Sequence, residues 1–419
     1  MASVRRRTLL GAGLAALGAS AGCAGVARTV GLGDSVRVAV SWSATELAAF
    51  RAVLAGWGDP GFELVPFGDD IDAALGARTT GRPNVVALPR PGLVAGNMAN
   101  LEPIPDELWH EQYNRGWSAS LPAGRHFALP FKRAHGSVVW YRRQVFEELH
   151  LEPPPTWDKW LAHNEVISKA GRVAPLALGG ADGWMLTGFF GNVLLRNFVA
   201  TYDELTRPDR DARLWQSSDV RAAFRLLGEM WGRPGTIAGG ARRALVQQFP
   251  DAVLEVFRFH RAAMVVVPDF AESVIRHFGV PQDEVGTFPF PAITENGGPF
   301  VQAGDLLVLT RPASKHAVDL IKYLGSPEAP VPWIRDTGGF IAANPDTSDR
   351  FYSTALRVLA AQLRDHDTRF DLADQLGRVG GRDGLQRVLV TFLKQLADGV
   401  PVHDAVDTAT GAMMRVEAG

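Results

Sequence analysis

The sequence predicts an α/β protein built from two domains. Residues 35–40 form an apolar run typical of a buried strand, and residues 45–57 place Leu47, Phe50, Leu54 and Trp57 along one helical face. This order of strand and helix repeats along the chain, which favours a largely parallel sheet. A length of 419 residues suits two domains better than one. The only cysteine is Cys23, so no intramolecular disulfide can form and the core must supply the stability.

Residues 1–22 are predicted to be a signal peptide, because three arginines precede an apolar run at residues 9–21. That run is shorter than the roughly 20 residues of a membrane-spanning helix. Arg6-Arg7 resembles a twin-arginine export motif, and residues 20–23 resemble a bacterial lipobox. Residues 23–34 are therefore expected to be a lipid-anchor linker starting at Cys23. An unmodified cysteine remains the alternative.

Cleavage before Cys23 leaves 40 basic and 45 acidic residues, because the leader holds three arginines and no acid. A nucleic-acid partner would need a basic face. The modestly acidic chain offers no sign of one, so no nucleic acid is expected as a partner.

The next elements continue the alternation of strand and helix. Apolar runs predict strands at residues 62–67, 84–88 and 138–141, and a helix is expected to begin at residues 144–149. Residues 80–83 give a turn signal before the strand at 84–88.

A second, mostly helical region is expected to begin near Thr156, a plausible N-cap for a helix starting at Trp157. The remaining pattern predicts helices at residues 220–231, 243–260, 317–324 and 385–396, and strands at 263–267 and 306–309. No internal repeat or low-complexity tract follows the leader, which argues against an adhesive or structural surface protein.

Several ordered blocks resemble the extracellular solute-binding proteins of carbohydrate ABC importers, a family that includes maltose-binding and glycerol-phosphodiester-binding proteins. The resemblance spans residues 35–415. The chain departs from it at Tyr141-Arg142-Arg143, where the family commonly has Tyr-Asn-Lys. The matching blocks are Leu129-Pro130, Trp140-Tyr141-Arg142-Arg143, Pro154-Pro155-Thr156-Trp157, Gly179-Gly180-Ala181-Asp182-Gly183-Trp184, Arg261-Ala262-Ala263-Met264, residues 286–291, Ala303-Gly304-Asp305 and Gly338-Gly339-Phe340-Ile341.

This resemblance implies a two-lobed periplasmic-binding-protein fold with a ligand cleft between the lobes and crossing hinge strands. Lobe 1 is then expected at residues 35–141 plus 290–345, and lobe 2 at residues 142–289 plus 346–419. It further implies an exported monomer, lipid-anchored to the outer face of the cytoplasmic membrane. Such a protein would capture a carbohydrate and deliver it to an ABC permease that has a separate ATPase.

Sugar sites combine polar side chains for the hydroxyls with aromatic rings for the C–H faces. Trp184 is the best candidate, because it lies in a Gly-rich loop where the family places an aromatic platform, with Asp182 beside it. Packing at a domain surface is the alternative for Trp184. Phe270 stands where relatives carry a stacking Trp, and Asp269 is either a ligand residue or a helix N-cap.

Ligands in α/β lobes sit at the carboxyl ends of strands. That rule adds Trp42 and Ser43 after the first strand, Asp70 after the second and Arg90 after the third. Thr45 is a possible helix cap in the same turn. His135 near the crossover, Asp305 at a hinge strand and Phe340 in a returning loop complete the candidates, and Asp305 has a turn role as its alternative.

An enzyme would need motifs that the sequence lacks. There is no HExxH, no Gly-x-Ser-x-Gly elbow and no Walker A loop, and no carboxylate pair is marked as that of a glycosidase. No metal site or cofactor is expected. A glycerophosphodiester is the alternative ligand, for which Arg90, Arg142 or Arg335 would face the phosphate.

Overall fold

The computed structural model describes residues 35–42, 44–59, 61–76, 81–111, 113, 117, 121, 125–293 and 297–418. The expected signal peptide, Cys23, the linker and Ser43 lie outside the described residues. No helix within the described ranges is long and apolar enough to cross a bilayer.

The larger of two sheets has the strand order β11-β5-β10-β3-β1-β2, with β12 and β4 also pairing with β10. Strand β10 is central and runs antiparallel to both β3 and β5. The strands are β1 (Val36–Val40), β2 (Phe62–Pro66), β3 (Val85–Leu88), β4 (Leu101–Glu102), β5 (Leu129–His135), β10 (Phe300–Thr310), β11 (Ile341–Ala342) and β12 (Thr368–Phe370).

The smaller sheet has the order β7-β8-β6-β9. Its strands are β6 (Val138–Arg142), β7 (Ala174–Ala177), β8 (Ala262–Val266) and β9 (Val285–Pro289). Only β7 and β8 pair in parallel, whereas β6 is antiparallel to both β8 and β9. The expectation of a largely parallel sheet is confirmed for β1, which pairs in parallel with β2 and β3. It was wrong for the two sheets as a whole, because β10 enters the larger sheet antiparallel to β3 and β5, and β6 is antiparallel to both of its neighbours.

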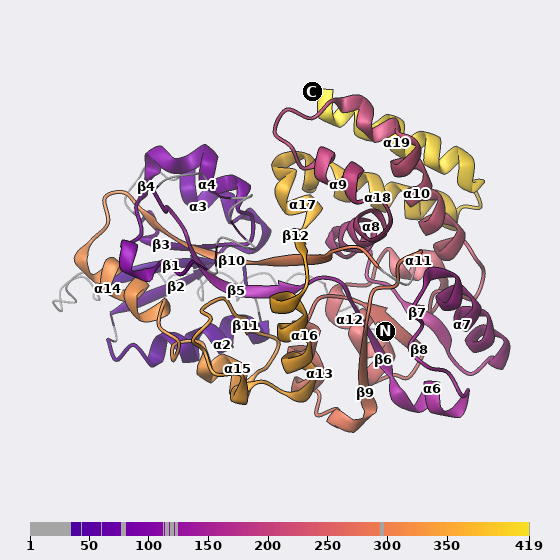
Figure 1. Ribbon diagram of the computed structural model, residues 1–419, viewed down its shortest axis with the longest axis horizontal. Coiled ribbons are helices and arrows are strands. Elements are labelled where there is room, and N and C mark those ends of the chain that lie inside the picture. Colours follow the sequence, from indigo (N-terminus) through magenta and orange to yellow (C-terminus); the bar gives the residue numbers. More distant parts are fainter. Residues whose placement is uncertain are drawn as a thin grey trace, which may run out of the picture.

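Each sheet carries its own helices, so the molecule has two lobes (Figure 1). In lobe 1, α3 and α4 lie on one side of the larger sheet, and α2 and α15 lie on the other. The helices grouped around this sheet are α2 (Ala44–Ala55), α3 (Asp72–Gly76), α4 (Gly92–Asn97), α14 (Lys315–Leu324) and α15 (Val331–Asp336). Helix α16 (Thr354–Asp365) lies beside β5, between the lobes.

Lobe 2 is mostly helical, as expected. Thr156 caps the helix that begins at Trp157, since its side chain accepts a hydrogen bond from the Lys159 amide. The helices are α6 (Arg143–Glu148), α7 (Trp157–Ala170), α8 (Trp184–Asn197), α9 (Val199–Leu205), α10 (Ser218–Trp231), α11 (Gly240–Ala244), α12 (Phe249–Phe257), α13 (Ala271–His277), α17 (Leu372–Gln375), α18 (Leu385–Ala397) and α19 (Val402–Ala418).

The single helix expected at residues 243–260 was wrong. Helix α11 ends at Ala244 and α12 begins at Phe249. A new helix start forms there because Gln248 and Asp251 make a capping box and Pro250 occupies the first turn.

The lobes are joined by extended segments that run between the two sheets (Figure 1). Strand β5 passes into β6 through Gly136 and Ser137. Asn192 of α8 holds this junction: its amide nitrogen donates to the Gly136 carbonyl at 2.9 Å, and its amide oxygen accepts from the Ser137 hydroxyl. The Ser137 hydroxyl in turn accepts from the amide of Val301 in β10 at 2.8 Å.

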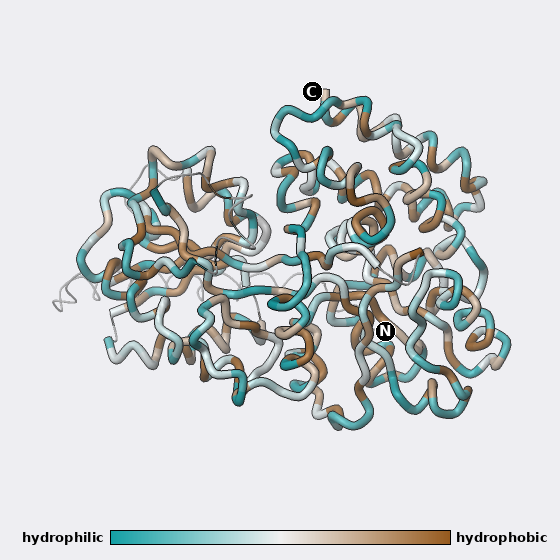
Figure 2. The backbone as a smooth tube through the Cα atoms, viewed as in Figure 1, coloured by the Kyte–Doolittle hydropathy of each residue, from teal (hydrophilic) through white to brown (hydrophobic). Residues whose placement is uncertain are grey.

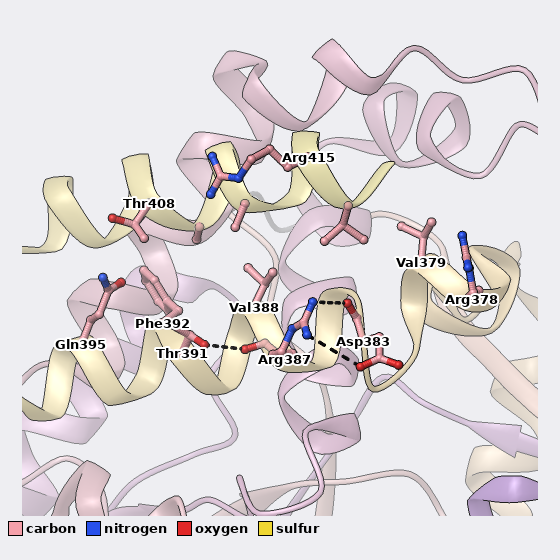
Figure 3. A pocket seen from close by; sticks show the side chains of 13 residues that line it. Arg378, Val379, Asp383, Arg387, Val388, Thr391, Phe392, Gln395, Thr408 and Arg415 are labelled. Carbon is pink, nitrogen blue, oxygen red and sulfur yellow. Dashed lines mark hydrogen bonds and ion pairs between the residues drawn. The ribbon is translucent and has the colours of Figure 1, made fainter. Parts of the chain in front are cut away.

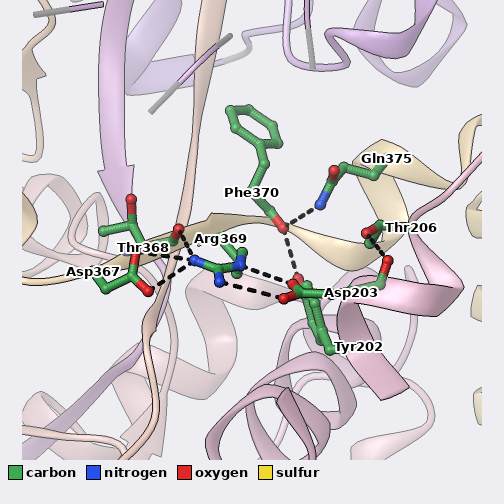
Figure 4. Close-up of polar contacts among 8 residues, drawn as sticks. All are labelled: Tyr202, Asp203, Thr206, Asp367, Thr368, Arg369, Phe370 and Gln375. Atoms are coloured by element: carbon green, nitrogen blue, oxygen red, sulfur yellow. Dashed lines mark hydrogen bonds and ion pairs between the residues drawn. The ribbon is translucent and has the colours of Figure 1, made fainter. Parts of the chain in front are cut away.

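Strand β12 provides another connection between the lobes (Figure 4). It pairs with the first residues of β10, while the Tyr202 hydroxyl of α9 donates to the Phe370 carbonyl at 2.6 Å. Arg369 forms an ion pair with Asp203 at 2.8 Å. One short strand is thus bound both to the larger sheet and to a helix of lobe 2.

Hydrophobic residues are concentrated along the strands and in parts of the helices, whereas many of the outer loops are hydrophilic (Figure 2). The core of lobe 2 holds fully buried Trp157, Trp160 and Trp215. The other apolar cluster begins in lobe 1 and extends to Val265 and Ile275 of lobe 2. The lobes therefore share buried surface where they face each other.

Candidate functional site

Where the lobes meet, one buried lysine is surrounded by carboxylates and aromatic rings. We call Glu46, Lys132, Asp269, Asp305, Trp42, Phe270, Trp333 and Phe340 the interlobe cluster. Lys132 lies in β5, and its register partner in β10 is Asp305. Trp42 follows β1, and Asp269 and Phe270 follow β8, so the cluster forms at the carboxyl ends of strands from both sheets.

Lys132 is only 2% exposed. Its Nζ donates to the Glu46 carboxylate at 2.6 Å and lies 5.1 to 5.9 Å from the ring centroids of Trp333, Phe270 and Phe340. Burial alone would lower the pKa of Lys132, but Glu46, Asp305 and Asp269 outweigh it and raise the pKa above its usual value. The ammonium is therefore held in its charged form.

The two aspartates are buried, and neither makes a direct ion pair with another described residue. Asp269 is fully buried; its Oδ1 accepts a hydrogen bond from the His135 amide, and its Oδ2 has no hydrogen-bond partner among the described residues. Burial raises its pKa to about 7 although Lys132 opposes the shift. Asp305 accepts from the Trp42 indole at 3.2 Å, and burial raises its pKa to about 6. Both carboxylates would gain from a hydroxyl donor.

Beside the cluster lies a group of half-buried rings, Trp184, Phe249 and Phe270, which we call the aromatic platform. Their ring centroids are 5.3 to 5.7 Å apart. Trp184 begins α8, Phe249 begins α12, and Phe270 directly precedes α13. Three segments of lobe 2 thus place partly accessible ring surface next to the polar groups of the interlobe cluster.

The structure brings together six of the residues singled out from the sequence: Trp42, Trp184, Asp269, Phe270, Asp305 and Phe340. Phe340 is fully buried against Phe131 and Trp333, so it forms the wall of the cluster. Trp184 is the first residue of α8 and not part of a loop. Asp269 does not cap α13, since its side chain binds the His135 amide, and Thr45 lies inside α2 rather than before it.

Other candidates lie elsewhere. Asp70 is exposed in a short 3-10 helix, Gly68–Asp70, and Asp182 is exposed before α8. Arg90 pairs with Asp72 at 2.6 Å. His135 ends β5, and burial lowers its pKa to about 3, so it is a neutral side chain at the crossing strand.

Sequence reasoning missed Lys132, Glu46, Phe249 and Trp333. Lys132 falls two residues after the matching Leu129-Pro130 block, in a strand that was not predicted. Phe249 was hidden inside the helix expected at residues 243–260. Glu46 was the one of these residues that the sequence could have indicated. It lies in the first turn of α2, the helix that follows β1, and so near the carboxyl end of that strand.

The arginines considered for a phosphate are not collected in the cluster. Arg335 pairs with Asp336 at 2.7 Å, and Arg142 donates to Gln144 at 2.6 Å. Lys132 is instead accompanied by three carboxylates. In the described parts of the chain, no group of three or more His, Cys, Asp or Glu side chains is placed to hold a metal ion.

A groove of about 580 Å³ lies away from this region, between α18 and α19. Figure 3 shows Arg387 turned toward Asp383, and Arg378 and Arg415 near the edges. The floor is formed by Val388 and Phe392, both buried. None of the residues that line this groove belongs to the interlobe cluster.

Comparison with known proteins places these features in a family context. The sequence pattern of the bacterial extracellular solute-binding proteins matches residues 83–329. The osmoprotective compounds-binding protein GgtB of Synechocystis sp. is 27% identical over 347 residues, which is 78% of this chain and 79% of that protein. The α-glucosides-binding periplasmic protein AglE of Rhizobium meliloti is 27% identical over 359 residues, 78% of this chain and 74% of AglE.

Solved structures share the fold at low identity. A chitin oligosaccharide binding protein superposes with a TM-score of 0.72 at 16% identity, covering 92% of this chain and 99% of that one. Maltose-bound MalE3 of T. maritima gives a TM-score of 0.68 at 17% identity, covering 90% and 98%. At such identities the likeness establishes the two-lobed fold alone.

Proposed function

Because the chain belongs to the bacterial extracellular solute-binding proteins, we propose that it captures a carbohydrate between its lobes and delivers it to an ABC permease. The observation that carries this proposal is the meeting of a buried ammonium, two buried aspartates and the aromatic platform where the lobes face each other. GgtB, AglE and a multiple sugar-binding protein of Streptococcus mutans, named for osmoprotective compounds, α-glucosides and sugars, are relatives that agree with it.

The chemistry of the cluster fits hydroxylated ligands. Each sugar hydroxyl both donates and accepts a hydrogen bond. Asp269 and Asp305 offer acceptors, and the Lys132 ammonium carries three N–H donors, of which Glu46 accepts one. The C–H face of a sugar ring would stack on Trp184, Phe249 or Phe270.

Entry of a ligand requires the lobes to part. Glu272 of α13 accepts from the amide of Gly339, and Arg276 of α13 donates to the Arg335 carbonyl at 2.7 Å. These bonds hold lobe 2 against lobe 1 beside the cluster. We therefore propose hinge opening about the segments joining the lobes, followed by closure around the ligand.

Export, a lipid anchor at Cys23 and a monomeric state belong to the same proposal, as do the lobe boundaries given above. The permease would supply the transmembrane subunits and a separate chain the ATPase. A relative from Pyrococcus horikoshii is named an extracellular-binding protein of an ABC transporter, which agrees with such a partnership. We propose binding without catalysis.

The test is a thermal-shift screen of the protein from Ala24 onward against mono-, di- and oligosaccharides, polyols and glycerophosphodiesters. A bound ligand stabilises the folded state by mass action. We expect a saturable shift with one class of uncharged sugar and no new product by mass spectrometry. A shift only with glycerophosphodiesters would contradict the carbohydrate proposal, and release of a product would contradict binding without catalysis.

A further inference from the structure

The Lys132 ammonium lies over three aromatic rings of the interlobe cluster. Its Nζ lies 5.1 Å from the Trp333 ring, 5.3 Å from Phe270 and 5.9 Å from Phe340. Aromatic rings at such distances attract an ammonium group through their quadrupoles. The cluster is therefore a cation cage whose occupant is part of the chain.

The cage takes contributions from both lobes. Glu46, Trp333 and Phe340 belong to lobe 1, whereas Asp269 and Phe270 belong to lobe 2. Lys132 reaches the cage from β5, and its side chain is 3% exposed. The ammonium thus contacts the Glu46 carboxylate of lobe 1 and the Phe270 ring of lobe 2 at the same time.

Other lysines of the described chain are placed differently. Lys322 pairs with Glu107 at 2.9 Å with its side chain 47% exposed, and Lys394 pairs with Asp398 with 67% exposed. Exposed pairs of this kind contribute little to stability. Burial among rings and three carboxylates separates Lys132 from these surface ion pairs.

We propose that Lys132 determines the charge specificity of the site: its ammonium fills the cation cage, so the protein rejects cationic ligands and takes uncharged hydroxylated ones. An added cation would meet the ammonium already present. An anion would meet Glu46, Asp269 and Asp305. The part of this inference that names uncharged hydroxylated ligands rests on the proposed carbohydrate function.

Truncation of the lysine gives a direct test. Lys132→Ala removes three methylene groups and the ammonium, and n-propylammonium replaces those atoms. We expect Lys132→Ala to have a lower Tm than the wild type and to recover it saturably with n-propylammonium but not with 1-propanol. Wild-type protein and Lys132→Met, which fills the same volume without charge, should not respond to the amine. Lys322→Ala is the matched control and should behave as the wild type does.

Absence of an amine response in Lys132→Ala, or an equal response in Lys132→Met or Lys322→Ala, would overturn the inference. If Lys132→Ala does not fold, the wild type still provides a test by acetylation of its lysines followed by peptide mass spectrometry. Lys132 should be acetylated at least tenfold more slowly than Lys322, and equal acetylation rates for the two lysines would contradict the proposal. Rescue by the amine without a thermal shift in any sugar would support the cation cage and contradict the carbohydrate function. The experiments therefore distinguish a failure of the cage proposal from a failure of the proposed function.

Discussion

The Asp269 carboxylate accepts a 2.7 Å hydrogen bond from the backbone amide of His135. Asp269 follows β8 of the smaller sheet, and His135 ends β5 of the larger one. The other carboxylate oxygen has no partner in the described structure. One side chain therefore both fixes a crossing strand and presents a buried acceptor where the lobes meet.

Stability should fall as the pH rises from about 4 to 7. The folded-state pKa values of Asp269, about 7, and Asp305, about 6, lie above the value of about 4 for an unfolded aspartate. Between these values the two aspartates bind more protons in the folded state than in the unfolded state, so they lower the unfolding free energy as the pH rises. His135 opposes part of this decrease, because its folded-state pKa of about 3 lies below the value of about 6.5 for an unfolded histidine. The two aspartates together outweigh it, so the net change is a decrease. Urea unfolding across this range measures the slope.

Asp305→Asn isolates one contribution to that slope. The amide does not titrate, so the variant should lose about 2 kcal/mol less than the wild type between pH 4 and pH 7. Identical pH profiles for the two proteins would show that Asp305 is not protonated preferentially in the folded state.

Trp184→Ala should weaken ligand binding by about 1 to 3 kcal/mol, because the ring would stack on the ligand. The Tm of the empty protein should change little, since Trp184 is only half-buried. Trp160 is the matched control: it is fully buried and stacks on Phe189, so Trp160→Ala should cost about 3 to 5 kcal/mol of stability. Titration calorimetry and thermal unfolding separate the two effects, and a large Tm loss for Trp184→Ala would mean a core role.

Gly136→Ala should destabilise the crossing by about 1 to 3 kcal/mol. A Cβ at Gly136 would lie 2.8 Å from the Val301 Cγ1 atom of β10, so the two crossing strands would have to separate. Gly188→Ala is the control, because a Cβ at this position of α8 would meet no described atom within 4 Å beyond its chain neighbours and the backbone of its own helix, and alanine favours a helix over glycine by about 0.5 to 1 kcal/mol. Equal denaturation midpoints for the two variants would contradict the close approach of the strands.

Asn192→Ala should cost about 2 to 3 kcal/mol, because it leaves the buried Gly136 carbonyl and the Ser137 hydroxyl without the amide that joins them. Asn197→Ala, later in α8, loses bonds nearer the surface and should cost about 1 kcal/mol or less. Denaturant unfolding compares the pair. A smaller loss for Asn192→Ala than for Asn197→Ala would argue against a structural role at the hinge.

The local sequence pattern was sufficient for strands that are apolar along their whole length. Val85–Leu88 and Ala262–Val266 are short, fully buried runs, and both were predicted as strands from apolar character alone. Strand β5 was missed because Lys132, Arg133 and His135 interrupt its apolar pattern. These residues are polar for reasons of tertiary position: Lys132 meets Glu46, and Arg133 donates to the Leu363 carbonyl.

The site was predictable where residues follow strands, as Trp42 and Asp269 do. It was not predictable where partners come from distant segments. Trp42 and Asp305 are 263 residues apart, and Lys132 and Glu46 are 86 apart. Spacing along the chain carries no information on such pairs, and the same rule of strand ends also selected Asp70, which is exposed.

The central position of β10 sets the order in which the chain can fold during its synthesis. Strands β3 and β5 both pair with β10, yet residues 300–310 are made long after residues 85–88 and 129–135. At about 5 to 20 residues per second, the ribosome needs roughly 10 to 40 s to make the residues between these strands and β10. Throughout this interval the edges of β3 and β5 that pair with β10 lack their partner. The larger sheet of lobe 1 can therefore be completed only after most of lobe 2 has left the ribosome.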